Sequence, residues 1–407
     1  MNIVLFAHPE FLGLRSQDQF AQMLHDEYAR RGHRVTLRRP REIVRARFAH
    51  GALAKWAGYV DQYLLWPPRL RAAMRDDPPD TLYVFCDQAL GPWVPSAARR
   101  PHVVHCHDLL ALRSALGEIP ENPTAWTGRV YQRYIRAGFR RARHAISISE
   151  RTRSDLHTFG GIPPGLSEVV HNGLGQALRP LDTVVARARL AAAGIDTDRR
   201  GCLLHVGGGQ WYKNDVGVVH LYAQHVRDAR AAGRAPLPLW MVSPPPRPAL
   251  ETALAQVPRG GNVRFFQSQS TEVVEAMYAH ARALLFPSLA EGFGWPVLEA
   301  MACGCPVLTT GEAPMTEVGG DVASYLPRLT FGEDVAAWAA RGGPVLAAVL
   351  QRDASERARR AAAGVARAAR FSVEAAIDSY LTVYRGVLDR EQPTPAGVPL
   401  HDRHRVA

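Results

Sequence analysis

The most informative stretch of the chain, residues 287–306, reads PSLAEGFGWPVLEAMACGCP. The apolar run Ala283–Phe286 precedes it and predicts a buried strand. Glu291–Gly294 is expected to form a loop, and Pro296 stands where a helix over residues 296–303 would begin, because the first helical turn tolerates proline. The segment therefore predicts a strand, a glycine loop and a helix, which is the repeating unit of a doubly wound parallel sheet.

This loop and helix are suited to binding a phosphorylated sugar. The N–H groups at a helix N-terminus lack intrahelical partners and lie at the positive end of the helix dipole, so they favour a diphosphate. Glu291 lies before the helix and Glu299 about one turn inside it, and both carboxylates could accept hydrogen bonds from sugar hydroxyls. The pattern alone is equally consistent with an ordinary glycine turn that carries two surface glutamates.

The segment resembles the Glu-x7-Glu signature of retaining glycosyltransferases of family 4 over about twenty positions. The resemblance implies that Glu299 holds the donor ribose and that Glu291 contacts the donor sugar. It also implies that the amides of Gly292, Phe293 and Gly294 meet sugar or phosphate. The resemblance further implies a nucleotide-sugar donor as co-substrate, with no other cofactor and no metal ion.

A second glycine loop occurs at residues 203–214, LLHVGGGQWYKN. Glycines let the backbone approach a ligand closely, and the Lys213 ammonium could neutralise a diphosphate. Lys213 is one of only two lysines in an arginine-rich chain, although a solvated lysine at a helix start is the simpler alternative. The loop resembles the family's Gly-Arg-x4-Lys phosphate site, which assigns Gly207, Gly208, Lys213 and Asn214 to the donor. Gly208 stands where the family usually has arginine.

Short apolar runs alternate with helical stretches through both halves of the chain, which predicts parallel sheets wound on both faces. The predicted strands are Ile3–Ala7, Leu82–Cys86, Val103–Cys106, Ala145–Ile148, Val169–Val170, Cys202–Val206, Leu237–Val242, Val263–Phe266, Ala283–Phe286 and Pro306–Thr309. Predicted helices include Ser16–Arg31, with Ser16 as its N-cap, Asn214–Arg230 and Thr271–His280.

The fold class expected is α/β, with two Rossmann-like domains facing across a cleft, the GT-B fold. We place an acceptor-side domain at residues 1–180 and a donor-binding domain at residues 198–370. Residues 371–390 are expected to form a helix that crosses back to the first domain, and residues 391–407 a flexible tail.

The first half has its own candidate, Val103-Val104-His105-Cys106-His107-Asp108. Because side chains alternate along a strand, His105 and His107 are expected to share one face near the strand end. A histidine after a strand is more often structural. The family has a similar histidine pair, whose second member faces the donor sugar and acceptor. That resemblance favours His107 as a catalytic group beside Lys213 and Glu291, with Asp108 fixing its tautomer.

The composition narrows the partners and the location. A net charge of +11 favours anionic partners, and the basic helical segment Arg129–Arg143 could lie on an anionic membrane, although a solvated arginine face is the simpler reading. No nucleic-acid recognition motif accompanies it. Five scattered cysteines suit reduced thiols, and no spanning segment or signal peptide is recognisable. We therefore expect a cytoplasmic protein, in peripheral contact with a membrane at most.

The function expected is retaining transfer of a sugar from a nucleotide-diphospho-sugar to a glycan, lipid-linked or small-molecule acceptor by front-face substitution. Asp196-Thr197-Asp198 matches a metal motif of another transferase fold, but it lies in a polar linker and is interpreted as a turn. Two alternatives remain open: a degenerate GT-B protein that binds without turnover, and a sugar-nucleotide epimerase. The sequence does not identify the donor, the acceptor, the linkage or the oligomeric state.

Overall fold

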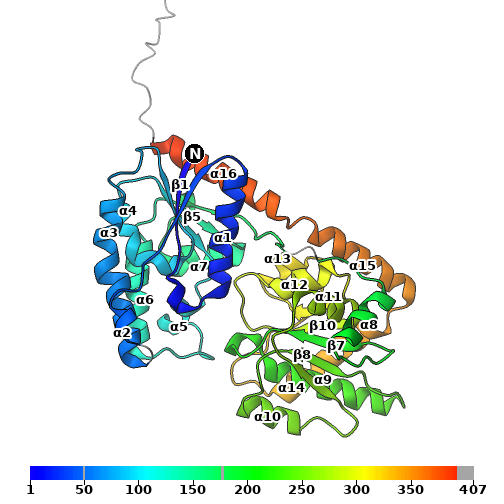
Figure 1. Cartoon of the computed structure of the whole chain (residues 1–407). Helices are drawn as coiled ribbons and strands as arrows, with labels where there is room; N and C mark the ends of the chain where they lie inside the picture. Colours follow the sequence, from blue (N-terminus) through cyan, green and yellow to red (C-terminus); the bar gives the residue numbers. More distant parts are fainter. Residues whose placement is uncertain (49–50, 176–177, 392–407) are drawn as a thin grey trace, which may run out of the picture. The chain divides into compact units, whose positions relative to one another are not determined.

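The chain folds into two six-stranded parallel sheets flanked by helices (Figure 1). The computed structural model describes residues 1–391 except 49–50 and 176–177. The first sheet has the order β2-β1-β3-β4-β5-β6 and the second the order β12-β11-β10-β7-β8-β9. Their strands are β1 (Asn2–Phe6), β2 (Arg34–Arg38), β3 (Leu82–Phe85), β4 (His102–Cys106), β5 (Ala145–Ser147), β6 (Ser167–Val169), β7 (Cys202–Val206), β8 (Leu239–Val242), β9 (Val263–Phe266), β10 (Ala281–Phe286), β11 (Val307–Thr310) and β12 (Ser324–Leu326).

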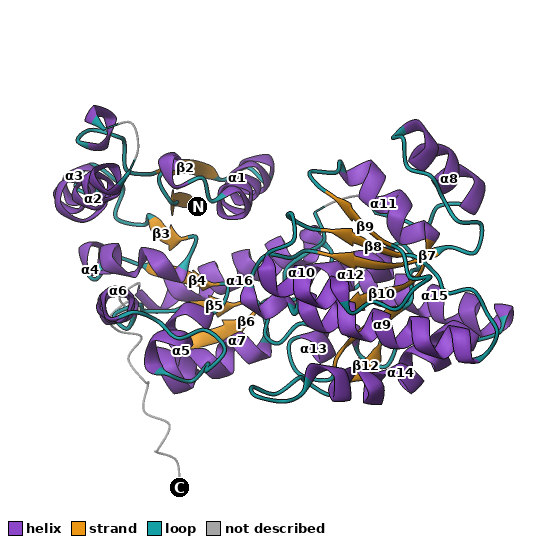
Figure 2. Cartoon of the chain, turned by 90° about the horizontal axis from the view of Figure 1, so that it is seen from below, coloured by secondary structure: helices purple, strands orange, loops and turns teal. Residues whose placement is uncertain are grey.

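Helices connect most of the strands and account for the parallel pairing, because a parallel crossover needs a long connection. They are α1 (Arg15–Arg30), α2 (Ala52–Val60), α3 (Trp66–Ala73), α4 (Val94–Ala97), α5 (Leu110–Leu116), α6 (Trp126–Phe139), α7 (Glu150–Asp155), α8 (Thr183–Ala192), α9 (Asp215–Ala231), α10 (Pro248–Ala255), α11 (Thr271–His280), α12 (Trp295–Ala302), α13 (Met315–Gly319), α14 (Val335–Gln351), α15 (Ala354–Ala368) and α16 (Val373–Glu391). Figure 2 shows the same elements coloured by type.

Every predicted strand is present, and two further strands were missed. β2 and β12 each lie at one edge of a sheet. The Ser16 cap was wrong: α1 begins at Arg15, and its N-cap position is Leu14, which makes no side-chain cap bond.

The second sheet is covered on both faces, as its apolar strands require. Leu204 and Leu284 face a core shared with α11 and α12, whereas the neighbouring residues Leu203 and Leu285 face a core shared with α9 and α14. Alternating side chains along each strand thus supply two separate cores, and every one of these four leucines is fully buried. The carboxyl ends of β7 and β10 are left open to loops that carry the candidate residues.

Contacts divide the chain into two compact units. One comprises Met1–His105, Ile135–Ile146 and the chain from Ile377 on; the other comprises Cys106–Tyr134 and Ser147–Ala376. Within the first unit, the buried hydroxyl of Tyr384 on α16 lies 3.1 Å from the Tyr28 hydroxyl and 2.7 Å from His105 Nε2.

The domain limits at residues 180 and 198 remain predictions, and α8 lies between them. The predicted tail lies outside the described residues, apart from its first residue, the last of α16. All five cysteines are buried, and none of them forms a disulfide. In the described part of the chain, no helix combines the length and apolar character needed to cross a bilayer.

Candidate functional site

The loop after β10 brings backbone N–H groups to the start of α12. The N-cap residue of this helix is Gly294, whose φ of 103° is one that residues with a side chain rarely adopt. Pro296 occupies the first turn of α12, where its missing N–H costs no intrahelical bond. The predicted strand–loop–helix is therefore present, with the helix one residue earlier than expected.

Glu291 in this loop is held by two donors. Its Oε1 accepts hydrogen bonds from Lys213 Nζ at 2.8 Å and from Ser288 Oγ at 2.8 Å. The side chains of Glu291 and Lys213 are only 8% and 13% exposed. Within the described residues no group donates a hydrogen bond to Oε2 of Glu291, so this oxygen can still accept one.

Lys213 is positioned by the glycine loop that follows β7. Gly207 and Gly209 have φ values of 99° and 78°, so the chain turns back on itself before the 3₁₀ turn that ends at Lys213. The ammonium lies 4.8 Å from the Phe286 ring centroid and 5.2 Å from that of Tyr212. These faces and the Glu291 carboxylate fix the charge between the two glycine loops.

Asn214 joins the same two loops. Its φ of 57° and ψ of 42° are left-handed, a conformation that asparagine tolerates better than most residues. Its Oδ1 accepts a hydrogen bond from the Gly217 N–H at 3.2 Å and caps α9, while Nδ2 donates to the Pro287 carbonyl at 2.9 Å. In this structure both polar atoms of the side chain are bonded to protein, so Asn214 would act on the donor through loop geometry.

Gly208 has no room for the arginine that the family usually has there. A β-carbon added to Gly208 would lie 2.7 Å from the Ser243 β-carbon and 3.2 Å from Oδ2 of Asp215. Asp215 also accepts a hydrogen bond from the Gly209 N–H at 2.9 Å. This carboxylate and the β8 loop therefore close the space beside the backbone of Gly208.

Arg247 supplies a cation at the same loop, and the sequence analysis missed it. Its Nη2 lies 3.1 Å from the position of a β-carbon built on Gly209. The side chain is exposed at the start of α10, and its charge contributes to lowering the pKa of Asp215. The signal in the sequence was a lone arginine in the proline-rich segment 243–248, just after the predicted strand Leu237–Val242.

Glu299 lies inside α12, where its Oε2 accepts a hydrogen bond from the Tyr278 hydroxyl at 2.9 Å. Burial raises the pKa of Glu299 above its ordinary value, although the Tyr278 hydroxyl and the Lys213 charge both act to lower it. Burial also raises the pKa of Tyr278. The carboxyl is thus held in one orientation, and no other protein hydrogen bond to it is found in the described residues.

Gly292 and Phe293 contribute differently from the glutamates. The Phe293 ring is buried in the core and packs against Trp295 and Phe371, so only its backbone is available to a ligand. The Gly292 carbonyl accepts a hydrogen bond from Ser149 Oγ at 2.8 Å. A β-carbon on Gly292 would lie 2.3 Å from the His107 carbonyl oxygen, so glycine is required for this close approach.

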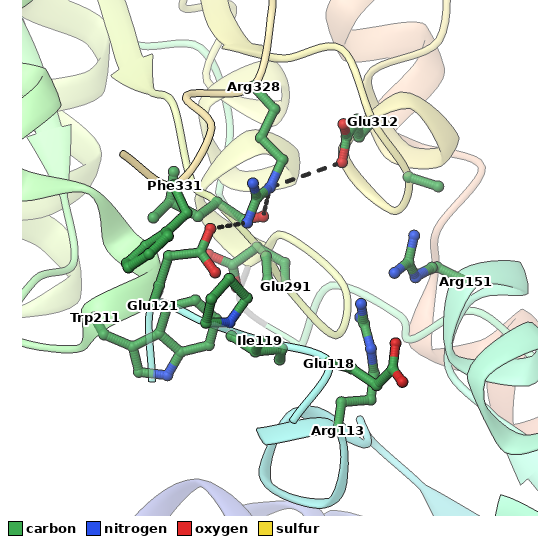
Figure 3. Close-up of a pocket in the computed structure, with 14 residues that line it drawn as sticks. Arg113, Glu118, Ile119, Glu121, Arg151, Trp211, Glu291, Glu312, Arg328 and Phe331 are labelled. Atoms are coloured by element: carbon green, nitrogen blue, oxygen red, sulfur yellow. Dashed lines mark hydrogen bonds and ion pairs between the residues drawn. The ribbon is translucent and has the colours of Figure 1, made fainter. Parts of the chain in front are cut away.

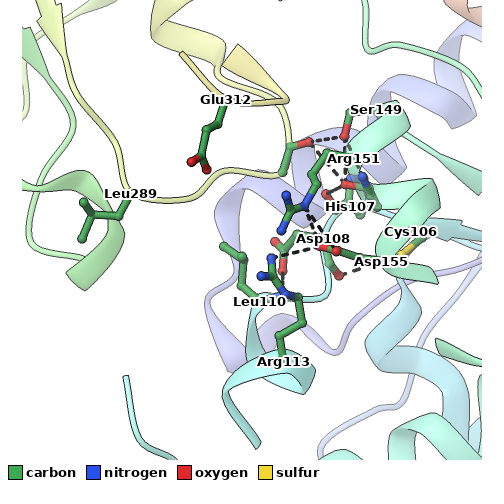
Figure 4. Close-up of polar contacts among 12 residues, drawn as sticks. Cys106, His107, Asp108, Leu110, Arg113, Ser149, Arg151, Asp155, Leu289 and Glu312 are labelled. Carbon is green, nitrogen blue, oxygen red and sulfur yellow. Dashed lines mark hydrogen bonds and ion pairs between the residues drawn. The ribbon is translucent and has the colours of Figure 1, made fainter. Parts of the chain in front are cut away.

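The two histidines at the end of β4 are separated. His105 is buried against Tyr380 and Tyr384, and its Nε2 contacts the Tyr384 hydroxyl, which gives it a structural role. His107 lies just beyond the strand and is partly exposed, near Ser149 in Figure 4. The Asp108 carboxylate accepts a hydrogen bond from the Leu110 N–H at 2.9 Å at the start of α5.

A cavity of about 370 Å³ opens beside Glu291 (Figure 3). Trp211 and Phe331 lie in its wall, and Arg328 donates hydrogen bonds to Glu121 at 2.6 Å and to the Leu289 carbonyl at 2.9 Å. The cavity therefore places a carboxylate, aromatic rings and a fixed guanidinium around one space that a sugar could fill.

Two further arginines line this cavity. Arg113 Nη1 and Arg151 Nε lie 3.2 and 3.3 Å from the same Asp155 oxygen, and Figure 4 shows the two arginines beside this aspartate. The pair is held in place by Asp155, which is buried. In the part of the chain that the structure describes, no cluster of three or more histidine, cysteine or acidic side chains could hold a metal ion.

Comparison with known proteins agrees with this arrangement. A family model described as Glycosyltransferase Family 4 matches residues 17–175, and one described as Glycosyl transferases group 1 matches residues 202–341. Together they cover every strand of the two sheets except β1.

Two curated relatives and one solved structure are instructive. D-inositol 3-phosphate glycosyltransferase of Frankia alni is 30% identical over 72% of this chain and 71% of its own length. O-antigen chain mannosyltransferase B of Escherichia coli is 43% identical over 63 residues, 16% of each chain. The crystal structure of Anabaena Alr3699/HepE in complex with UDP and glucose superimposes with a TM-score of 0.65 at 16% identity, covering 95% of this chain and 100% of that one. At that identity the likeness shows the GT-B fold alone.

Proposed function

Since this chain belongs to glycosyltransferase family 4 and is a glycosyltransferase, we propose that it transfers a hexose from a nucleoside diphosphate sugar with retention of anomeric configuration. The acceptor is a glycan, a lipid-linked sugar or a small molecule. The names of relatives support this class: one acts on an inositol phosphate, another on an O-antigen chain, and a structure of the same fold was solved with UDP and glucose.

The observation that carries the proposal is the ion pair between Lys213 and Glu291, at 2.8 Å. It brings together the only lysine of the second unit and the first glutamate of the signature, from loops 78 residues apart. With a donor bound, the ammonium neutralises the diphosphate, and the free Oε2 of Glu291 accepts a hydroxyl of the sugar. Glu299 holds the ribose, and the amides before α12 receive phosphate oxygens.

Arg247 supplies the second cation of the diphosphate site in our proposal. Two phosphates carry more negative charge than Lys213 alone balances, and Gly208 provides none. The Arg247 guanidinium lies against Gly209 on the same loop, within reach of a ligand that rests on the loop backbone. A planar fork from α10 would thereby replace the arginine that most of the family has at position 208.

The reaction we propose is front-face substitution. The bond from the anomeric carbon to the diphosphate oxygen breaks, and that oxygen takes the proton of the acceptor hydroxyl as the new glycosidic bond forms on the same face. The protein stabilises the departing diphosphate through Lys213 and positions the acceptor through His107. None of these steps calls for a metal ion or for a cofactor besides the donor.

A thermal-shift screen against UDP, GDP, ADP, dTDP and their sugar conjugates tests the donor site. A ligand at a hundred times its dissociation constant stabilises the fold by about 2.7 kcal/mol. One nucleotide should stabilise the wild type but not Lys213→Ala. Lys55→Ala is the matched control, because Lys55 is the other lysine and is exposed on α2.

Activity is measured next. Transfer in the presence of a chelator, followed by NMR assignment of the product anomer, tests metal independence and retention together. If no nucleotide stabilises the wild type, the degenerate binding protein is the better interpretation. Interconversion of sugar nucleotides without transfer would favour the epimerase.

The exposed face of α6 supports peripheral contact with an anionic membrane as part of this function. Trp126, Val130 and Tyr134 recur every four residues and are 74%, 52% and 45% exposed. Arg129 and Arg133 are exposed between them. Apolar and cationic side chains on one exposed face are typical of helices that lie in the headgroup region.

Sedimentation with vesicles tests the membrane contact. The protein should sediment with phosphatidylglycerol vesicles but not with phosphatidylcholine vesicles, and Trp126→Ser should reduce the bound fraction. Trp56→Ser is the control, since Trp56 is 65% exposed on α2. Equal loss in both variants, or no binding to either vesicle, would rule out the α6 face.

A further inference from the structure

A second, larger hollow is lined only by residues of the first unit. It has a volume of about 1060 Å³ and lies at the carboxyl ends of β1 and β2, next to α3. Trp66, Arg69 and Ala73 line it from α3 at positions i, i+3 and i+7, which is one face of a helix. Parallel sheets bind ligands at the carboxyl ends of their strands, so this is a reasonable place for a substrate.

The lining of this hollow is strongly basic. Four arginines line it, against two glutamates: Arg38, Arg39, Arg41 and Arg69, with Glu10 and Glu42. Two of the four arginines are already neutralised. Both terminal nitrogens of Arg38 bond to Asp77, at 2.6 and 2.7 Å, and Arg39 lies 3.2 Å from Asp18.

Arg41 and Arg69 are different. Among the described residues no ion pair involves either of them, and both are exposed. Glu42, the nearest acidic neighbour in sequence to Arg41, is paired with Arg45 at 3.1 Å. Two guanidiniums from separate elements therefore carry uncompensated charge at one hollow.

Aromatic side chains also line the hollow. Trp66 packs against Trp93 with ring centroids 5.9 Å apart, and Phe11 is held under the Arg45 guanidinium at 5.0 Å. Rings fixed in this way offer flat apolar surfaces beside the cations. The combination suits a molecule that joins a phosphate to a sugar ring, because guanidinium recognises phosphate through paired N–H bonds.

We infer that this hollow binds a phosphate group of the acceptor through Arg41 and Arg69, with the adjoining sugar against Trp66. The identification of the ligand as the acceptor rests on the proposed function. The site itself rests only on residues of the first unit. The inference assigns the acceptor to the class of phosphorylated sugars, whether free or linked to a lipid by the phosphate.

Calorimetric titration tests the inference on Lys213→Ala protein, in which the proposed donor phosphate site is disabled. The probes are glucose 1-phosphate, glucose and glucuronate. Glucose 1-phosphate should bind and glucose should not. Arg41→Gln and Arg69→Gln, each added to Lys213→Ala, should weaken the binding about ten-fold or more, as expected for a charged hydrogen bond. Arg71→Gln is the control, because Arg71 is exposed on α3 but does not line the hollow.

Each other outcome overturns the inference. If glucuronate binds as tightly as glucose 1-phosphate, the hollow does not select phosphate over carboxylate. If Arg71→Gln weakens the binding equally, the effect is one of general charge. No heat with any probe in the millimolar range would show that the hollow is not a phosphate site. Titrating a vesicle-bound polyprenyl phosphate separates the lipid-linked source from the free sugar phosphate.

The two proposals fail in distinguishable ways. If the donor assignment is wrong, no nucleotide stabilises the wild type, yet glucose 1-phosphate still binds at Arg41 and Arg69. If the acceptor site is wrong, the donor nucleotide stabilises wild type and Arg41→Gln equally, while the calorimetric signal is absent.

Discussion

Lys213 is fixed by three contacts of two kinds before any ligand arrives. The Glu291 carboxylate pairs with its ammonium, and the rings of Phe286 and Tyr212 lie within 5.2 Å of it. A side chain held in place loses little rotamer entropy when the diphosphate binds, so the charge is already oriented toward the loops. Such a group contributes most where negative charge develops, on the leaving oxygen.

Lys213→Ala should therefore lower kcat more than it raises KM. We expect kcat to fall by about 10²–10³-fold, as when one preorganised donor to a developing charge is removed. Lys213→Arg should recover only part of the activity, because a planar fork does not fit the place of a point charge. Steady-state kinetics with saturating acceptor measures both constants. A rise in KM for the donor with kcat unchanged would refute the assignment.

Arg247→Gln should also weaken diphosphate stabilisation. The expected loss in kcat/KM for the donor is roughly 10- to 100-fold, the range for one charged hydrogen bond. Arg259→Gln is the control, because Arg259 is an exposed arginine just after α10. Competition by free nucleoside diphosphate gives a direct check: its inhibition constant should rise in Arg247→Gln only. An unchanged inhibition constant would show that Arg247 does not take the place of the arginine that the family usually has at position 208.

At the scale of elements, the buried strands could be predicted from the sequence and the edge strands could not. β10 has Ala283–Phe286 fully buried and reads as a continuous apolar run. β2, which reads RVTLR, lies at a sheet edge with its side chains partly exposed, so its arginines obscured the strand pattern. The Ser16 cap failed because α1 begins one residue earlier, and local propensity does not fix a helix boundary so closely.

The candidate site divides in a similar way. Lys213 and Glu291 were predicted from motifs at fixed spacing, and the structure brings them into contact. Arg247 and Arg328 were missed, because each comes from a segment without a motif and reaches its place only through tertiary packing. Contacts between sequence-distant loops are set by the fold as a whole, whereas a motif records only local spacing.

Asn214 is the element-scale test, because it joins the start of α9 to the loop after β10. Asn214→Ala should destabilise the fold by about 2 kcal/mol or more, since it removes an N-cap and leaves the buried Pro287 carbonyl without its donor. Asn214→Asp keeps the cap but not the donor, so it should cost less. Urea denaturation measures both. Equal stability of all three proteins would show that the loops are held by other contacts.

At the scale of the whole molecule, the shifted pKa values of titratable groups determine how the free energy of unfolding changes with pH. Burial alone would raise the pKa of Asp215, but His205, whose Nε2 lies 3.4 Å from Oδ1, and the hydrogen bond from the Gly209 N–H leave this pKa lowered overall. The pKa of Glu317 is lowered as well. Burial acts to raise it, but the hydrogen bond with His171 and those from two backbone N–H groups lower it by more. A carboxyl whose folded pKa is lowered stabilises the protein above its unfolded pKa, and this contribution is lost as the pH falls below about 4.

Two histidines, His225 and His280, extend this loss of stability to milder acid. Burial lowers the pKa of His225 and of His280, so folding favours their neutral forms. Their contribution is complete above the unfolded value near 6.5 and declines as the pH falls through it, because the unfolded chain then binds more protons. The melting temperature should therefore drop between pH 7.5 and 5.5, and His280→Gln should flatten that drop. His25→Gln on α1 is the control, since this histidine is partly exposed and pairs with Asp26. A drop of the same size in His280→Gln would show that other groups set the acid limit.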